Sequence, residues 1–460
     1  MRTGMRQGFT TQGLLSGLIA LLLALCAAAS PARAELRAGA GRAEIRLPGD
    51  LLPIQGFGVQ YDPLQARVLI LRGDGPRVAL VVIDLTSISE EEVSAMKAVV
   101  GRAASVELAN VIICASHTFS APHIMPAGRP FPGLDSEAEK AKNEAFRAAV
   151  AEALKAAATT AASTVRPARL GFGRGVSDVN INRDQHTPEG FWLGVDSAGV
   201  SDKSVSVIRI EDLRHHPLAI VANYAVQPSI MDQSVVAGGG KAITGDLTGA
   251  AMRRVEALYG DDLVSFFLVG AAGDQAPILK ARRAVADKDG RLTQTDIGDK
   301  GYLLVDLLGE RLAQDIVRTS EKISMRTDDA VVKVTRGSTV LKAQERPKSL
   351  QDLHPTNTYA FTSAGDLPAP FVILRLGDIA VTGVQVELSS QSGEAIKRRS
   401  PFAHTIVATM VDGAAKYMPD AASYDKVTYE AMNSSYARGS AEALSDEILK
   451  VLEHLATDRR

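Results

Sequence analysis

The chain has 460 residues, of which 46% are hydrophobic and 5% aromatic, and its formal net charge is −2 at pH 7. A chain of this length can bury a large core, as one large domain or as two lobes. The balanced charge gives no sign of a nucleic-acid partner, and no basic face suggests constitutive membrane binding. The scarcity of aromatic residues argues against a platform that stacks sugars or bases.

The N-terminus is typical of a secretory signal peptide. Arginines at positions 2 and 6 precede an apolar run at about residues 14–29, and an A-x-A cleavage signal follows at residues 32–34. We therefore expect residues 1–34 to be removed and the mature chain, residues 35–460, to be exported to a periplasm or out of the cell. No later stretch reaches the ~20 apolar residues needed to cross a bilayer, so no transmembrane segment is expected in the mature chain.

The mature chain begins with a glycine-rich segment and two apolar runs. Residues 38–45 are interpreted as a tight turn that enters a short strand. Residues 64–71 and 78–83 are rich in β-branched side chains and are joined by a Gly-Asp-Gly-Pro turn, which predicts a hairpin.

Two capping boxes predict the helices that follow. Ser89 with Glu92 starts a helix that leads to the apolar strand 111–115, and Ser136 with Glu139 starts a long alanine-rich helix. Strand, helix and strand in this order imply a right-handed crossover and a parallel strand pair.

The remaining segments continue the alternation of strands and helices. The polar residues 180–202 are interpreted as a surface loop. The other predicted strands are residues 204–210, 218–226, 263–269, 371–376, 379–382 and 405–411, and the other predicted helices start near 244–246, cover 302–316 and end near 396. The predicted class is α/β, with mixed β-sheets, helices packed around them and a site at the carboxyl ends of strands.

Five polar residues fall just beyond apolar strand runs, namely His117, Gln227, Asp274, Glu387 and Tyr417. Polar groups gathered at strand ends are where a site is expected. Structural alternatives stay open at this point: His117 could bond a backbone carbonyl, Glu387 could cap the following helix, and Tyr417 could be a core tyrosine.

Short motifs in a fixed order carry a resemblance to a known family. They are AGAGRAEI at 38–45, VVIDLTSI at 81–88, CASHTFSAP at 114–122, NINR at 180–183, TGD at 244–246, GAAGDQAP at 270–277 and VELSSQSG at 386–393. In order and separation they resemble the catalytic domain of the neutral, non-lysosomal ceramidases over nearly the whole mature chain. The β-sandwich module that follows this domain in full-length ceramidases is not expected here.

The resemblance implies a zinc ion held by two histidines, a glutamate and a tyrosine, and cleavage of an amide bond. The first histidine falls on His117, the glutamate on Glu387 and the tyrosine on Tyr417, whereas the second metal-binding histidine falls on Gln227. We predict that His117, Gln227, Glu387 and Tyr417 hold the metal, and that His117, Asp274 and Tyr417 take part in catalysis.

The sequence departs from the family pattern at functional positions. Phe119 replaces the second histidine of the family's H-T-H motif, and Ala276 replaces a serine discussed as a nucleophile. A glutamine carbonyl is a poor zinc ligand beside an imidazole, so Gln227 should weaken metal binding or favour another ion. His123 or Asp246 could replace the missing ligand if the loop folds inward.

The leading hypothesis is an exported, metal-dependent hydrolase that cleaves an N-acylsphingosine or a related N-acyl lipid through a metal-activated water. One alternative is a non-catalytic lipid- or ligand-binding protein with a degenerate metal site, for which Gln227 and Ala276 are the evidence. Another is a metal-dependent hydrolase of a different amide or ester. The expected partner is an amide-containing lipid or small molecule, and peripheral contact with a membrane stays open.

Overall fold

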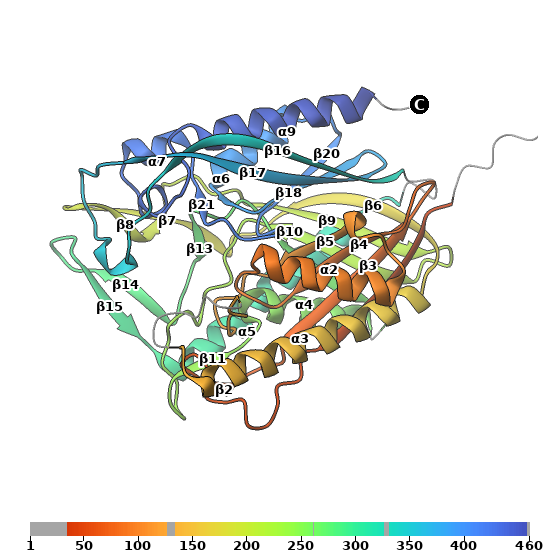
Figure 1. Ribbon diagram of the computed structural model, residues 1–460, viewed down its shortest axis with the longest axis horizontal. Coiled ribbons are helices and arrows are strands. Elements are labelled where there is room, and N and C mark those ends of the chain that lie inside the picture. The colour runs from red at the N-terminus through yellow and green to blue at the C-terminus, as the bar shows by residue number, and fades with distance from the viewer. Residues whose placement is uncertain (1–34, 127–133, 261, 326–330, 458–460) are drawn as a thin grey trace, which may run out of the picture. The chain divides into compact units, whose positions relative to one another are not determined.

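The structure, a computed structural model drawn in Figure 1, describes residues 35–126, 134–260, 262–325 and 331–457. Residues from Glu35 onward form one compact unit. The predicted signal peptide, residues 1–34, lies outside the described residues.

A large mixed sheet is the centre of the fold, with strand order β12-β10-β9-β6-β1-β3-β4-β5. Its neighbouring strands run antiparallel except for the pairs β4/β5 and β10/β12, which are parallel. The strands are β1 (Arg37–Glu44), β3 (Gln65–Arg72), β4 (Val78–Ile83), β5 (Val111–Ala115), β6 (Arg166–Val176), β9 (Ser204–Asp212), β10 (Pro217–Tyr224) and β12 (Val264–Val269).

A second mixed sheet packs on the first, with strand order β16-β17-β18-β20. Its strands are β16 (Val332–Gln344), β17 (Ser363–Leu376), β18 (Ile379–Val384) and β20 (His404–Ala408). Side chains of both sheets, such as Leu80 and Phe266 from the large one and Leu374 and Ile406 from the small one, share one buried core. Alternate side chains on each strand point to opposite faces, which is why each sheet also has an outer face to cover.

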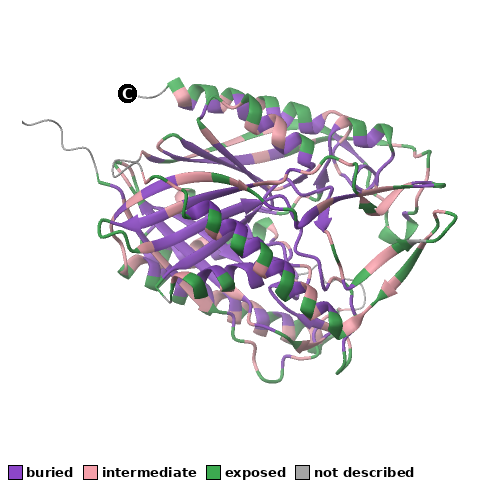
Figure 2. Ribbon diagram, turned by 180° about the vertical axis from the view of Figure 1, so that it is seen from behind, coloured by how far each residue is buried: buried purple, intermediate pink, exposed green. Residues whose placement is uncertain are grey.

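Helices cover both outer faces (Figure 1). On the large sheet lie α2 (Glu90–Ala104), α3 (Glu137–Ser163), α4 (Asp246–Tyr259) and α5 (Gly301–Ser320), and on the small sheet lie α6 (Ser390–Arg399) and α9 (Ser440–Thr457). The order of layers is helix, sheet, sheet, helix. Figure 2 shows the sheets buried and the outward faces of the helices exposed. The predicted α/β class is confirmed.

Short strands, helices and turns lie in the segments that connect the main strands and helices of these layers. They are β2 (Phe57–Gln60), β7 (Asn180–Thr187), β8 (Gly190–Asp196), β11 (Lys241–Ile243), β13 (Gln275–Pro277), β14 (Arg282–Ala286), β15 (Leu292–Asp296), β19 (Glu387–Leu388), β21 (Tyr417–Met418), α7 (Ala421–Asp425) and α8 (Tyr429–Met432), with 3-10 turns at Leu108–Asn110, Gly298–Lys300 and Leu350–Asp352. Among the described residues, no helix is long and apolar enough to cross a membrane.

Both predicted capping boxes start helices as expected. The Ser89 hydroxyl accepts a hydrogen bond from the Glu92 amide at 3.3 Å, and the Ser136 hydroxyl accepts one from the Glu139 amide at 3.2 Å. The β3/β4 hairpin and the parallel β4/β5 pair are also confirmed.

The tight turn predicted within residues 38–45 is wrong, because residues 38–44 belong to β1. Helix α3 crosses directly over this strand. A Cβ atom at Gly41 would overlap the Ala157 carbonyl and lie 2.7 Å from the Ala161 amide nitrogen. The glycines therefore allow the helix to approach the strand closely and do not form a turn.

The surface loop predicted at residues 180–202 is also wrong, because β7 and β8 pair there as an antiparallel hairpin. Its polar residues are partly internal. Asn180 is fully buried, and its amide nitrogen donates to the carbonyls of Asp202 and Ala225 at 3.0 and 2.7 Å. Internal hydrogen bonds let such polar residues form a buried strand.

We expect Gly41→Ala to lower the free energy of unfolding by about 1–3 kcal/mol, because overpacking an interior usually has this effect. Gly49→Ala is the matched control, since a Cβ atom there meets nothing within 4 Å. Urea denaturation of both variants measures the difference. Equal stability of the two would contradict the close approach of α3 to β1.

Candidate functional site

His117 follows β5 and is held on both sides of its ring. Its Nδ1 lies 2.5 Å from the Thr86 carbonyl oxygen and its Nε2 lies 3.1 Å from Glu387 Oε2. The residue is 3% exposed, and its backbone has a φ of 64°. A non-glycine residue in this left-handed region is strained, and such strain is concentrated at functional sites.

Glu387 reaches His117 from the small β19/β21 pair, in which it lies directly opposite Tyr417. Its Oε2 also accepts a hydrogen bond from Gln227 Nε2 at 2.8 Å. Burial acts to raise the pKa of Glu387, but the contact with His117 and the positive charges of Arg183 and Lys416 outweigh it and lower the pKa. Glu387 is therefore a buried carboxylate that stays ionised.

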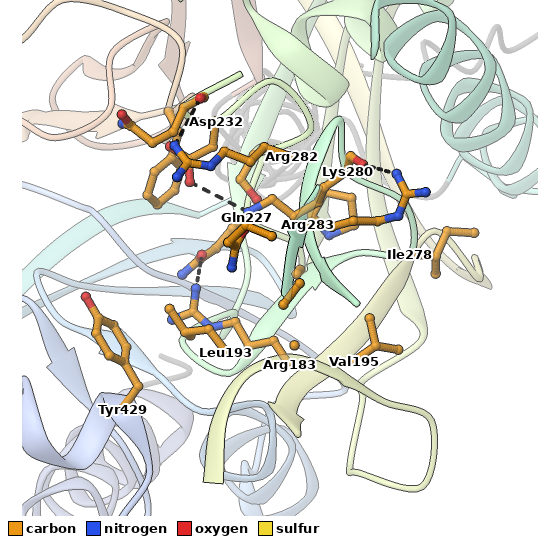
Figure 3. Close-up of a pocket in the computed structure, with 18 of the residues that line it drawn as sticks. Arg183, Leu193, Val195, Gln227, Asp232, Ile278, Lys280, Arg282, Arg283 and Tyr429 are labelled. Carbon is orange, nitrogen blue, oxygen red and sulfur yellow. Dashed lines mark hydrogen bonds and ion pairs between the residues drawn. The ribbon is translucent and has the colours of Figure 1, made fainter. Parts of the chain in front are cut away.

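Gln227 links this carboxylate to Arg183. The Gln227 Oε1 accepts a hydrogen bond from Arg183 Nη1 at 2.6 Å (Figure 3). Arg183 Nε donates to Glu430 Oε1 at 2.8 Å. The Arg183 guanidinium can only donate and the Glu387 carboxylate can only accept. Together they fix the orientation of the Gln227 amide, with its oxygen toward Arg183 and its nitrogen toward Glu387.

Tyr417 lies beside Arg183, with the Arg183 guanidinium carbon 5.3 Å from the centre of its ring. Its ring also meets Tyr429 edge-on, with centroids 5.9 Å apart. Burial and the nearby Glu387 carboxylate raise the pKa of Tyr417. The phenol consequently stays protonated and can donate a hydrogen bond.

Three of these side chains line a pocket of about 400 Å³. Arg183, Gln227 and Tyr417 contribute to its wall, together with Phe119 and Ala276. The segments that follow β5 and β10 meet here, because the Phe119 amide donates to the Pro228 carbonyl at 3.1 Å. A pocket of this size accommodates part of a small amphipathic molecule.

Asp274 supports the site from outside this network. Its carboxylate accepts hydrogen bonds from the Ser390 amide at 2.8 Å and from Asn182 Nδ2 at 3.2 Å, and its backbone carbonyl accepts one from the Arg183 amide at 2.9 Å. Burial raises the pKa of Asp274 to about 7. The structure thus brings His117, Gln227, Glu387 and Tyr417 together and places Asp274 behind Arg183. The catalytic role of Asp274 stays a prediction.

The donor set does not fit a tetrahedral zinc ion in this arrangement. The described residues contain no group of three or more His, Cys, Asp or Glu side chains that could hold a metal ion. His117 and Glu387 are hydrogen-bonded to each other, and Gln227 turns its amide nitrogen to Glu387 and its oxygen to Arg183. Both carboxylate oxygens of Asp246 accept backbone amides, those of Ile230 and Met231 among them. Asp246 therefore holds a loop.

His123, the other candidate substitute ligand, lies in an unfavourable field for a cation. Its backbone forms two hydrogen bonds of 2.8 Å with the side chain of Gln55. Burial, together with the positive charges of Lys416 and Lys241, lowers the pKa of His123 to about 4. These lysines would also oppose a metal ion there.

Arg183 and Glu430 are the residues of the site that sequence reasoning missed. Arg183 belongs to the NINR motif, to which the sequence alone assigns no role. The prediction of a surface loop at residues 180–202 gave no reason to place Arg183 in a buried site. Glu430 is 1% exposed and meets Arg183 across 247 positions of the chain, so no local pattern could reveal it.

The raised pKa of Asp274 predicts a pH dependence of stability. The folded protein retains the proton up to about pH 7, whereas the unfolded chain loses it near an ordinary carboxyl value of about 4. The folded state then binds more protons in this window, so this contribution to stability is present at low pH and is lost as the pH rises to about 7. Denaturation at pH 5, 6, 7 and 8 should show a decrease in wild type that is smaller in Asp274→Asn, and equal slopes would contradict it.

Comparison with known proteins supports the fold. By sequence, the chain matches no protein-family model and no characterised protein. By structure, it aligns with a ceramidase complexed with C2 at a TM-score of 0.70 and 16% identity, covering 92% of this chain and 76% of the other. A neutral ceramidase from Pseudomonas aeruginosa aligns at 0.65 and 16% identity, covering 90% and 74%. The predicted resemblance is confirmed at the level of the fold, which is that of the neutral ceramidases.

Proposed function

We propose that the protein is a ceramidase-like hydrolase that cleaves the amide bond of an N-acyl lipid or a related N-acyl compound. The observation that carries this proposal is the buried His117–Glu387 pair, which Gln227 connects to a pocket that Tyr417 and Arg183 line. The fold of the neutral ceramidases supports it, although fold alone does not establish chemistry.

The chemistry of the wall suits an amide carbonyl. Hydrolysis places negative charge on the carbonyl oxygen as water adds, and donors fixed in a buried site stabilise that charge. The protonated Tyr417 hydroxyl and the Arg183 guanidinium are such groups, and Glu430 and Gln227 hold the guanidinium in place. The His117–Glu387 pair is the proton-handling group that we assign to the attacking water and the leaving amine.

The resemblance implies that the reaction requires zinc, but the proposal does not include that requirement. We expect the wild-type protein to bind zinc weakly, because Gln227 offers no lone pair toward His117 and Glu387 in its present orientation. The roles assigned to Tyr417, Arg183 and the His117–Glu387 pair do not depend on the ion.

Export to a periplasm or to the cell exterior, with peripheral contact to a membrane that supplies the lipid, belongs to the same proposal. Its basis is the N-terminal sequence pattern.

A non-catalytic ligand-binding protein is the second candidate function. It is favoured by Ala276, which stands at the pocket where the ceramidase resemblance implies a serine, and by the Gln227 amide held between Arg183 and Glu387. Turnover distinguishes the two functions, because a binding protein retains affinity for the N-acyl compound without releasing fatty acid.

Tyr417→Phe should lower kcat for hydrolysis of an N-acyl amide by about 10²–10³, because loss of one oxyanion donor has this effect in other hydrolases. The measurement is release of fatty acid by mass spectrometry. Tyr302→Phe is the matched control, since Tyr302 stacks on Tyr61 away from the pocket. Equal loss in both variants, or none in Tyr417→Phe, would remove the role assigned to Tyr417.

Gln227→His should raise the affinity for zinc by at least about 10²-fold, because an imidazole replaces an amide beside His117 and Glu387. Elemental mass spectrometry and competition with a chelator measure this affinity without reference to activity. Gln227→Leu removes the same hydrogen bonds without adding a ligand and serves as control. If Gln227→His bound zinc no more tightly than Gln227→Leu, the proposed ligand geometry would be wrong.

A further inference from the structure

We propose that the substrate carries an anionic group, which binds at the cationic wall of the pocket formed by Lys280, Arg282 and Arg283. This inference rests on the proposed function and specifies the class of N-acyl compound that the pocket accepts. Figure 3 shows the three residues together on one side of Gln227, with Arg183 on the other side.

The charges on this wall are not equally neutralised. Lys280 forms an ion pair with Asp232 at 3.6 Å, and Arg183 is paired with Glu430. Arg283, by contrast, donates to the Lys280 carbonyl at 3.2 Å and makes no ion pair with a carboxylate of the described residues. A guanidinium at a pocket wall without a carboxylate partner attracts an anion from solvent.

Arg282 contributes less to the same field. It donates to the Gln233 carbonyl at 3.3 Å and is exposed. Its neighbour across the β14/β15 pair is Asp296, whose carboxylate interacts with the Arg282 charge and offsets part of it. Among the described residues that line the pocket only Asp232 is acidic.

The pocket wall also has an apolar part. Leu193 and Val195 of β8 and Ile278 contribute to it, and Val195 is 46% exposed. Figure 3 shows Leu193 and Val195 on the Arg183 side of Gln227, away from Lys280. A pocket with both apolar and cationic side chains is suited to a molecule with an acyl chain and a negatively charged head.

The favoured substrate is thus an N-acyl compound whose amine part carries a carboxylate, sulfonate or phosphate group. The amide would lie near Gln227 and Tyr417. Cleavage adds one water across the C–N bond and yields a fatty acid and an amine that retains the anionic group. A ceramide headgroup has hydroxyl groups but no negative charge, and it leaves the Arg283 guanidinium without an ionic partner.

The test compares N-dodecanoylglycine with N-dodecanoylglycinamide, which differ in charge and hardly in shape. We expect kcat/KM to favour the glycine conjugate by at least about tenfold, since hydrogen bonds between ionised partners are the stronger ones. Arg283→Gln should reduce this preference by a similar factor, and Arg282→Gln by less. Arg291→Gln is the matched control, because Arg291 lies beyond the same hairpin turn and does not line the pocket.

Binding separates failure of this inference from failure of the proposed function. If the protein hydrolyses neither compound and no ceramide, the hydrolase proposal fails, and calorimetry on the same pair still tests the anion site. Tighter binding of the glycine conjugate, weakened in Arg283→Gln and by added salt, supports the site. Equal binding or turnover of the two compounds, or an equal effect of Arg291→Gln, overturns it.

A third compound identifies the anion. N-dodecanoylaminomethylphosphonate has the same acyl chain with a phosphonate head. A higher kcat/KM or affinity than for the glycine conjugate assigns the wall to phosphate-like groups, and a lower one to carboxylates. Either ranking supports an anionic substrate, provided that Arg283→Gln removes the preference over the glycinamide.

Discussion

The buried carboxylate of Glu387 is the interaction on which the rest of the site depends. It receives His117 from the loop after β5 and Gln227 from the loop after β10, and through Gln227 it is connected to Arg183 on β7. Elements of several sheets therefore meet at one ionised group. An unpaired charge in such an interior would be strongly unfavourable, so these partners position one another and fix the pocket wall.

The same constraint explains why the ceramidase pattern is altered without loss of the architecture. Where the resemblance implies a second histidine, Gln227 satisfies a guanidinium on one side and a carboxylate on the other. The resulting hydrogen-bonded network holds Glu387 and Arg183 in place. The cationic side of the pocket is the basis of our proposal that the substrate is anionic, unlike a neutral sphingolipid.

Local patterns predicted much of the fold, because caps, hairpins and apolar runs depend on neighbours in sequence. Ser89 and Ser136 illustrate this, as their side chains cap helices three residues away. The sequence alone misassigns the glycines of β1, because the helix residues that require them, Ala157 and Ala161, lie over 110 positions later than Gly41. The expectation that polar residues directly after strands form a site correctly identified four members of the network, namely His117, Gln227, Glu387 and Tyr417. The Arg183–Glu430 pair could not be predicted, because the two residues are distant in sequence. The segments on which they lie also have no sequence pattern that indicates a buried ion pair.

The most direct test of the account is hydrolysis of an N-acyl amide in ¹⁸O-labelled water by wild type and by Glu387→Gln. The substitution preserves shape and removes the charge that orders His117, Gln227 and Arg183. The account predicts that wild type releases fatty acid with one ¹⁸O atom in the carboxyl group and that Glu387→Gln releases at least about 100-fold less. No labelled fatty acid from wild type, or equal release by both proteins, would contradict it.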